Sequence, residues 1–190
     1  MIVHKGTQKI ETERLILRKF KIDDVEGMFK NWATDKEVSK FLSWNPHKSV
    51  DETRQIINGW IDGYVKDNSY NWVIELKNLG EVIGQISLVG LNEKYSSCEV
   101  GYYIGSVFWG KGIMTEALKA VIDYVFNEIG LNRIEARHNT LNPASGRVMQ
   151  KCDMKQEGIL RQVKIDKNGN FYDLAVYSVL QDDYYVYNLL

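Results

Sequence analysis

Residues that organise small secreted or metal-bound proteins are scarce in this 190-residue chain, which has two prolines, two cysteines and three histidines. Cys98 and Cys152 form no CxxC pair, so we expect buried packing thiols and a reduced, cytoplasmic setting. His4, His47 and His138 are far apart and lack the spacing of metal ligands. We therefore expect no metal site.

Long apolar runs and a charge imbalance are also missing. No segment approaches the ~18 apolar residues of a membrane span, and the amino terminus has no apolar signal-peptide region. The 24 Lys and Arg residues nearly balance the 25 Asp and Glu residues, which gives a formal net charge of −1. This balance offers no general electrostatic attraction to nucleic acid. We expect neither a membrane nor a nucleic acid as partner.

The chain does have a regular succession of strand-like and helix-like apolar patterns. Its length and its hydrophobic content of 44% suit a full core, and we expect one continuous mixed α/β domain over residues 1–190. The aromatic tail at 182–190 suits either a homodimer contact or packing on its own domain. The expected helices run from 25 to 32, 50 to 65, 115 to 127 and 143 to 152, and the expected strands from 12 to 20, 71 to 76, 82 to 91, 98 to 104, 133 to 139, 154 to 165 and 171 to 180.

A glycine-rich turn that starts at Gly105 joins a predicted strand to the longest predicted helix. Such a turn leaves backbone N–H groups unpaired at a positive helix end, which suits a phosphate group. Its Gly-x4-Gly-Lys-Gly spacing misses the P-loop pattern by one residue, because Gly112 stands where the magnesium-binding hydroxyl belongs. Thr115 replaces the third glycine of a Rossmann fingerprint, and the chain has no G-x-S-x-G elbow. Alone, the turn predicts a phosphate-bearing ligand or no ligand.

Residues 109–118, Trp-Gly-Lys-Gly-Ile-Met-Thr-Glu-Ala-Leu, resemble the acyl-CoA-binding turn of the GCN5-related N-acetyltransferase (GNAT) superfamily. The likeness covers nearly the whole chain and is greatest to the branch of the RimJ and RimL ribosomal-protein N-terminal acetyltransferases. It implies an α/β fold whose twisted, mixed but mostly antiparallel sheet has about seven strands, is splayed at a cofactor cleft and is flanked by about four helices. The other matching segments are 12–18, 83–86, 99–102, 142–145, 157–158 and 173–177.

Some positions depart from the family pattern. Trp109 and Met114 stand at the two ends of its [Q/R]-x-x-G-x-[G/A] motif, so that only Gly112 matches. Met149 replaces the tyrosine that serves many relatives as general acid. Asp153 stands where a glycine usually ends the helix, and Asp tolerates the left-handed cap conformation better than most residues.

The resemblance implies acetyl-CoA as the acetyl donor, bound without a metal. Backbone groups of Tyr103 and Ile104 are expected to pair with the pantetheine arm, and the amides of the following turn to hold the diphosphate. The cofactor-binding residues expected on this basis are Tyr103, Ile104, Trp109, Gly110, Lys111, Gly112, Ile113, Met114, Thr115, Asn142 and Ser145.

Several of these residues also have a plain structural interpretation. Lys111 is equally well a solvated lysine at a helix start, and Asn142 suits the N-cap of the helix begun by Pro143. Arg147 and Lys151, four residues apart, are candidates for the cofactor's ribose phosphate, but a solvated basic face explains the pair better.

Direct transfer to an amine needs a base, an oxyanion donor and a proton source for the departing thiolate. The resemblance makes Glu99 the first candidate for the base, acting through water, with a structural carboxylate in a sheet salt bridge as the alternative. Ser145 and Tyr177 are candidates for the acid or for substrate positioning. Their alternatives are a first-turn hydroxyl and a core aromatic.

The expected class of acceptor depends on how strong a base the amine needs, because the amine must be neutral to attack the thioester. An α-amine has a pKa of about 7.7–8.0 and lysine one of about 10.4, so the α-amine is far easier to use in its neutral form. We therefore expect the acceptor to be the N-terminal α-amine of a protein, and the resemblance implies a ribosomal protein. We expect the aromatic loop 41–47 to line the acceptor site. The alternatives are a small amine, such as a polyamine or an aminoglycoside, and a noncatalytic acyl-CoA-binding module.

Overall fold

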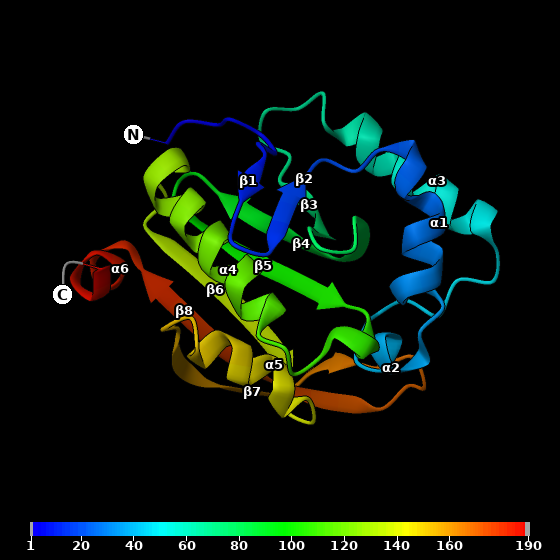
Figure 1. Cartoon of the computed structure of the whole chain (residues 1–190). Helices are drawn as coiled ribbons and strands as arrows, with labels where there is room; N and C mark the ends of the chain where they lie inside the picture. Colours follow the sequence, from blue (N-terminus) through cyan, green and yellow to red (C-terminus); the bar gives the residue numbers. More distant parts are fainter. Residues whose placement is uncertain (1, 189–190) are drawn as a thin grey trace. The chain divides into compact units, whose positions relative to one another are not determined.

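The computed structural model describes residues 2–188, which form two compact units (Figure 1). The N-terminal unit comprises His4–Ser87 and Tyr102–Ala120, and the C-terminal unit comprises Leu88–Gly101 and residues 121–188, with residues 2 and 3. The chain passes between units inside two strands, β4 (Glu81–Asn92) and β5 (Ser97–Ile104), and inside one helix, α4 (Ile113–Tyr124). Each unit is therefore built from segments that are discontinuous in sequence.

The N-terminal unit contains antiparallel strands in the order β1-β2-β3-β4, followed by the end of β5. In β2 (Leu15–Arg18), Leu15 and Leu17 are fully buried and alternate with half-buried residues, as a strand with one covered face requires. This strand is shorter than the expected 12–20, and β1 (Ile10–Glu11) was not expected. β3 (Asn71–Leu76) lies within one residue of its predicted bounds.

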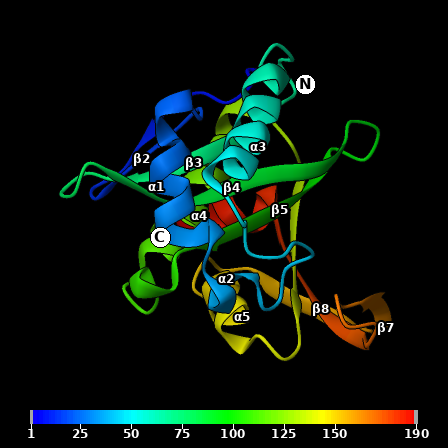
Figure 2. The same ribbon diagram turned by 90° about the vertical axis from the view of Figure 1, so that its right-hand side faces the viewer.

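Helices cover this unit on the side shown in Figure 2, where α1 (Val25–Met28) and α3 (Val50–Gly63) lie side by side. A π-helical turn, η2 (Phe29–Ala33), extends α1, and the predicted 25–32 helix is confirmed in that form. Ser49 caps α3 by accepting a hydrogen bond from Glu52 N at 3.2 Å, as its capping-box spacing predicted. The core of the unit consists of Phe20, Val25, Met28, Trp32, Ala33, Val38, Ile57, Val73 and Val82.

The C-terminal unit has the strand order β4-β5-β6-β8-β7. β5 runs parallel to β6 (Arg133–Asn139), whereas β8 (Phe171–Leu180) is antiparallel to both β6 and β7 (Lys155–Ile165). Helix α5 (Pro143–Gln150) follows β6. These bounds agree with the predicted elements within two residues, and the predicted mixed, mostly antiparallel α/β class is confirmed.

The structure also contains elements that the sequence patterns did not predict. Besides β1, they include two short helices, α2 (Lys36–Ser39) and α6 (Gln181–Asn188), and two 3-10 turns, η1 (Ile22–Asp24) and η3 (Ser106–Phe108). α4 starts two residues before the prediction and continues as a π-helical turn that ends at Gly130, whose φ is 80°. Of the aromatic tail, residues 189 and 190 lie outside the described part of the chain. The homodimer contact and the single domain stay predictions.

Candidate functional site

Two left-handed glycines shape the turn before α4. Gly110 has a φ of 74° and Gly112 a φ of 73°, and Lys111 lies between them with an ordinary negative φ. A Cβ atom on Gly110 would meet nothing within 4 Å, so the backbone conformation rather than space calls for glycine. Where right- and left-handed residues alternate, successive N–H groups turn toward one point and make a concave anion-binding nest, and two left-handed glycines on either side of Lys111 favour this arrangement.

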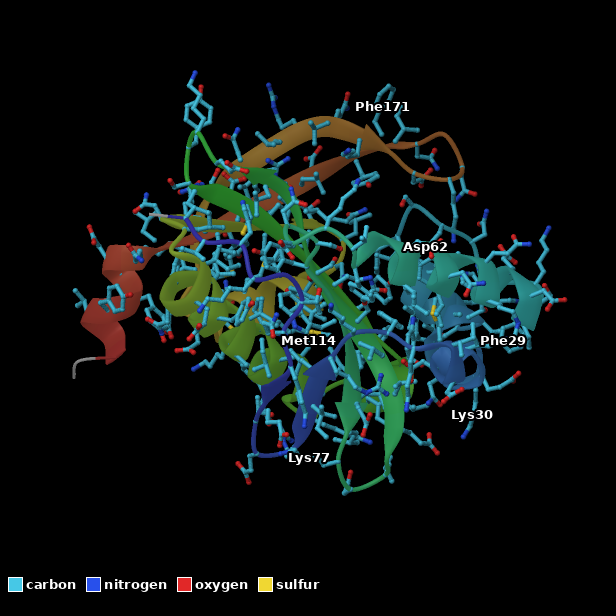
Figure 3. The ribbon with its side chains drawn as sticks, turned by 90° about the horizontal axis from the view of Figure 1, so that it is seen from above. Phe29, Lys30, Asp62, Lys77, Met114 and Phe171 are labelled. Atoms are coloured by element: carbon cyan, nitrogen blue, oxygen red, sulfur yellow. The ribbon has the colours of Figure 1, made fainter. Side chains whose placement is uncertain are left out.

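The amides of the first turn of α4 add to this nest. Glu116 N donates to Gly112 O at 3.1 Å, which is the first helical hydrogen bond. The amides of Ile113 and Met114 come before this bond, at the positive end of the helix dipole. The side chains of Ile113 and Met114 are buried, with 3% and 7% exposure, and Met114 is labelled in Figure 3. Packing therefore fixes the side chains of this turn, while its backbone supplies the donors.

Close contacts fix where the turn begins. A Cβ atom on Gly105 would lie 2.1 Å from Asn31 O, so no larger residue fits there. Ser106 N donates to Asp35 Oδ2 at 3.1 Å, and Trp109 Nε1 donates to Ile104 O at 2.9 Å. A carbonyl oxygen has two lone pairs, so the bond from Trp109 Nε1 does not by itself prevent Ile104 O from accepting a second donor such as a pantetheine amide.

A polar clamp between the start of β2 and α4 was missed by the sequence analysis. Glu116 Oε1 accepts from Thr12 Oγ1 at 2.6 Å and from Arg14 N at 2.9 Å, and its Oε2 accepts from Arg14 Nε at 2.6 Å. Arg14 Nη1 donates to Lys111 O at 2.9 Å. Burial alone would raise the pKa of Glu116, but the hydrogen bonds from Thr12 and Arg14 outweigh it and lower that pKa.

The predicted acceptor loop lies in the same unit as the predicted pantetheine strand. The Trp44 ring meets the Tyr103 ring edge-on at 5.7 Å and the His47 ring at 5.6 Å. His47 Nδ1 lies 2.8 Å from Thr53 Oγ1, and burial lowers the pKa of this histidine. The Tyr103 hydroxyl donates to Gln85 Oε1. The structure thus brings the aromatic loop to the end of β5.

In the C-terminal unit, the candidate base lies in a row of alternating charges. Glu99 Oε2 is 3.5 Å from Arg137 Nε, and Arg137 also meets Glu135 at 3.1 Å. Arg133 pairs with Glu135 at 2.9 Å and with Glu157 at 2.5 Å. The Glu99 side chain is 34% exposed and accessible to water. Glu99 therefore has Arg137 as a partner, as its structural interpretation requires, and its role as the catalytic base remains a prediction.

The other predicted residues of this unit lie on or beside α5. Asn142 occupies the N-cap position, although its side chain makes no capping bond, and Ser145 lies half-buried in the first turn. Tyr177 is buried, with its hydroxyl donating to Gln156 Oε1 at 3.1 Å and accepting from Gln150 Nε2 at 3.3 Å. These contacts favour the core-aromatic interpretation of Tyr177.

The sequence-predicted residues thus fall into two groups. The residues from Tyr103 to Thr115 belong to the N-terminal unit, whereas Glu99, Asn142, Ser145 and Tyr177 belong to the C-terminal unit. Asp153, where the family usually has glycine, adopts the predicted left-handed conformation with a φ of 60°. Arg147 and Lys151 are exposed, as a solvated face requires.

Other candidate features lie apart from these groups. A cavity of about 480 Å³ in the N-terminal unit is lined by Arg18, Asp24, Glu75 and Glu81 among others, and by none of the predicted residues. Within residues 2–188, no three His, Cys, Asp or Glu side chains gather as metal ligands would, and no helix is long and apolar enough to cross a membrane. Cys98 is buried, which raises its pKa to about 12 and confirms a packing thiol.

Comparison with known proteins identifies the family. Residues 14–155 match the model of the acetyltransferase (GNAT) domain. The N-acetyltransferase YoaA of Bacillus subtilis is 34% identical over 90% of this chain and 96% of its own length. The [ribosomal protein uS5]-alanine N-acetyltransferase of Escherichia coli is 27% identical over 79% of each chain. A GNAT-family acetyltransferase from Bacillus anthracis has a similar structure, with a TM-score of 0.81 and 26% identity over 92% of this chain and 99% of that one. This chain belongs to the GNAT family of N-acetyltransferases.

Proposed function

We propose that this protein transfers the acetyl group of acetyl-CoA to the N-terminal α-amine of a protein. The observation that carries the proposal is the pair of left-handed glycines, Gly110 and Gly112, directly before α4. A concave set of backbone amides at a helix N-terminus suits the diphosphate of coenzyme A, and no magnesium-binding hydroxyl is needed. The family's acetyl-transfer chemistry supports acetyl-CoA as the donor.

The donor's pantetheine arm is assigned to the end of β5. Tyr103 and Ile104 supply the backbone groups, and a carbonyl such as Ile104 O can accept from an amide donor in addition to Trp109 Nε1. The amides from Gly110 to Thr115 are assigned to the diphosphate. Asn142 and Ser145 are proposed as further polar contacts of the cofactor.

The proposed chemistry uses the neutral amine as nucleophile. Its nitrogen forms a bond to the thioester carbonyl carbon, the C–S bond breaks, and the thiolate takes up a proton. We assign proton removal from the amine to Glu99 through water, because this carboxylate is partly exposed. Ser145, rather than the buried Tyr177, is our first choice for the acid.

The acceptor assignment depends on the amine's pKa and on the aromatic loop. A protein α-amine needs only weak assistance to be neutral near pH 7.4, whereas lysine, with a pKa of about 10.4, needs a strong base. Trp44 stacks edge-on to Tyr103, so apolar peptide side chains would find aromatic contacts beside the proposed pantetheine strand. The uS5-alanine relative supports a protein substrate of this kind.

A thiol-release assay tests the proposal. Acetyl-CoA is combined in turn with peptides of defined N-terminus, spermidine and kanamycin, and free coenzyme A is measured with a thiol reagent. We expect release with the peptides, blocked when their N-termini are already acetylated. Release with spermidine or kanamycin alone would move the assignment to a small amine. Coenzyme A binding with no release for any acceptor would contradict the transfer reaction.

A further inference from the structure

We infer that Arg14 is a positioning residue that holds the diphosphate-binding turn in its anion-binding shape. This inference rests on the proposed function, because it assigns a role in binding coenzyme A. Arg14 immediately precedes β2, whereas Lys111, in the turn before α4, is 97 residues further along the chain. Both β2 and α4 are labelled in Figure 1. Their contact is a long-range link between two elements of the N-terminal unit.

Three hydrogen bonds fix Arg14. Its backbone N and its Nε both donate to the Glu116 carboxylate, at 2.9 and 2.6 Å, and its Nη1 donates to Lys111 O at 2.9 Å. The neighbouring Leu15 is fully buried, and its N donates to Thr12 Oγ1 at 3.0 Å. The guanidinium is thus held by a carboxylate on one side and faces the turn on the other.

The bond to Lys111 O determines which way the next amide points. In a planar trans peptide the C=O and the following N–H point in opposite directions. Because the Lys111 carbonyl is turned toward Arg14, the Gly112 N–H is turned away from it. A Cβ atom placed on Gly112 would lie 3.7 Å from Arg14 Nη2, which shows how closely the guanidinium backs this residue. Arg14 therefore supports the nest from behind, on the side opposite the donors.

Glu116 makes this arrangement compatible with an anion. A carboxylate in the first turn of α4 would by itself repel a diphosphate bound at the same helix end. Here Glu116 is only 18% exposed and is paired with Arg14, so its charge is balanced inside the clamp. Arg14 and Glu116 act together: the carboxylate holds the guanidinium, and the guanidinium holds the turn.

The first test measures coenzyme A affinity by calorimetry. Arg14→Gln should raise the Kd for coenzyme A roughly 10-fold, because the turn loses one charge-assisted hydrogen bond that orients its donors. Arg54→Gln is the matched control, since Arg54 is 44% exposed against 42% for Arg14 and lies on α3; its Kd should equal the wild-type value. Pantetheine, which lacks the diphosphate, should bind Arg14→Gln and wild type equally.

Two further variants separate positioning from charge. Arg14→Lys keeps the charge but lacks the fork that reaches both Glu116 and Lys111 O, and it should not restore affinity. The double variant Arg14→Gln with Glu116→Gln leaves the net charge unchanged and should also remain weak. Wild-type affinity in either variant would show that charge alone matters and would overturn the inference.

An amide spectrum of the free protein supplies a readout that does not depend on binding. The Gly112 N–H resonance should shift in Arg14→Gln and stay in place in Arg54→Gln. An unmoved Gly112 resonance together with a wild-type Kd would overturn the positioning role while leaving the proposed function intact. Failure of the wild-type protein to bind coenzyme A would instead contradict the proposed function, and the assignment of Arg14 would fall with it.

Discussion

The glycine turn of the N-terminal unit and the charged row of the C-terminal unit offer two kinds of candidate chemistry. The turn presents backbone donors, while the Met114 side chain packs inward and Arg14, from before β2, supports the turn from behind. The charged row presents side chains, and Glu99 is already paired with Arg137. The binding capacity of the turn depends on its backbone φ angles, whereas the chemistry of the charged row depends on which partners its carboxylates have.

This difference determines what can be concluded from each region. A set of backbone donors has few other uses, so the turn points strongly to an anion. An ion-paired carboxylate is compatible both with catalysis and with sheet stability, and its geometry alone does not distinguish the two. The structure therefore supports binding of the acetyl donor by the turn more strongly than proton transfer by Glu99.

The largest expected effect comes from the candidate base. Glu99→Gln should lower kcat/KM about 100-fold if this carboxylate accepts the amine proton. Glu135→Gln is the matched control, because Glu135 lies opposite Glu99 in the parallel pair and shares Arg137. Its kcat/KM should change less than about threefold by the same reasoning. Equal small losses in both variants would make the row purely structural and would sharpen the contrast with the turn.

The next effect tests the backbone of the turn. Gly112→Ala places a Cβ on a left-handed residue, at a cost of about 1–2 kcal/mol, and should weaken coenzyme A binding roughly 10-fold. Gly169→Ala, at a φ of 86° in the β7–β8 turn, carries the same strain without touching the nest. Calorimetry should show an unchanged Kd for that variant. A loss of affinity in both would mean that general destabilisation, not the nest, is being measured.

A smaller effect concerns the stability of the charged row. Arg133→Gln removes the hydrogen bonds of Arg133 to Glu135, Glu157 and Ser178 and should lower the free energy of unfolding by about 1–2 kcal/mol, as measured by urea denaturation. The Kd for coenzyme A should be unchanged. A larger Kd for coenzyme A with unchanged stability would show that the charged row contributes to cofactor binding.

The smallest effect is a pH dependence at the end of the row. Hydrogen bonding to Arg133 and Ser178 lowers the pKa of Glu157 from 4.5 to about 2. The stabilisation that results is complete above pH 4.5 and is lost as the pH falls toward 2, because the unfolded state binds the proton first. Since the side chain is 42% exposed, solvent screens much of it. Melting temperatures of wild type should fall more over this range than those of Glu157→Gln, and parallel curves would count against the effect.

Local sequence signals predicted most of the fold. Ser49 and Glu52 marked the start of α3, Asp153 was read as a left-handed cap, and Gly110 and Gly112 marked the turn. Short elements were missed, because a two-residue strand such as β1 or a four-residue helix such as α2 is too short for a hydrophobic period to show.

The missing parts of the site were those built by long-range contacts. Arg14 and Glu116 are 102 residues apart, and nothing in either neighbourhood indicates the other. The pairing of Glu99 with Arg137 likewise depends on which strands become neighbours. Residue patterns reveal which groups are suited to a reaction, whereas the register of the sheet decides which of them are already engaged.

The chain passes between the two units inside β4, β5 and α4. This connectivity affects truncation, proteolysis and folding during synthesis. Neither unit is a contiguous stretch, so a simple truncation does not yield either of them whole, and within residues 2–188 the three later crossings lie inside β4, β5 and α4 rather than in linkers. A chain stopped at Gly101 lacks the turn, and a chain stopped at Ala120 has the turn but lacks residues 121–188 of the C-terminal unit. We therefore expect cofactor binding and acetyl transfer to appear together during synthesis, once the last strands, β7 and β8, have completed the fold.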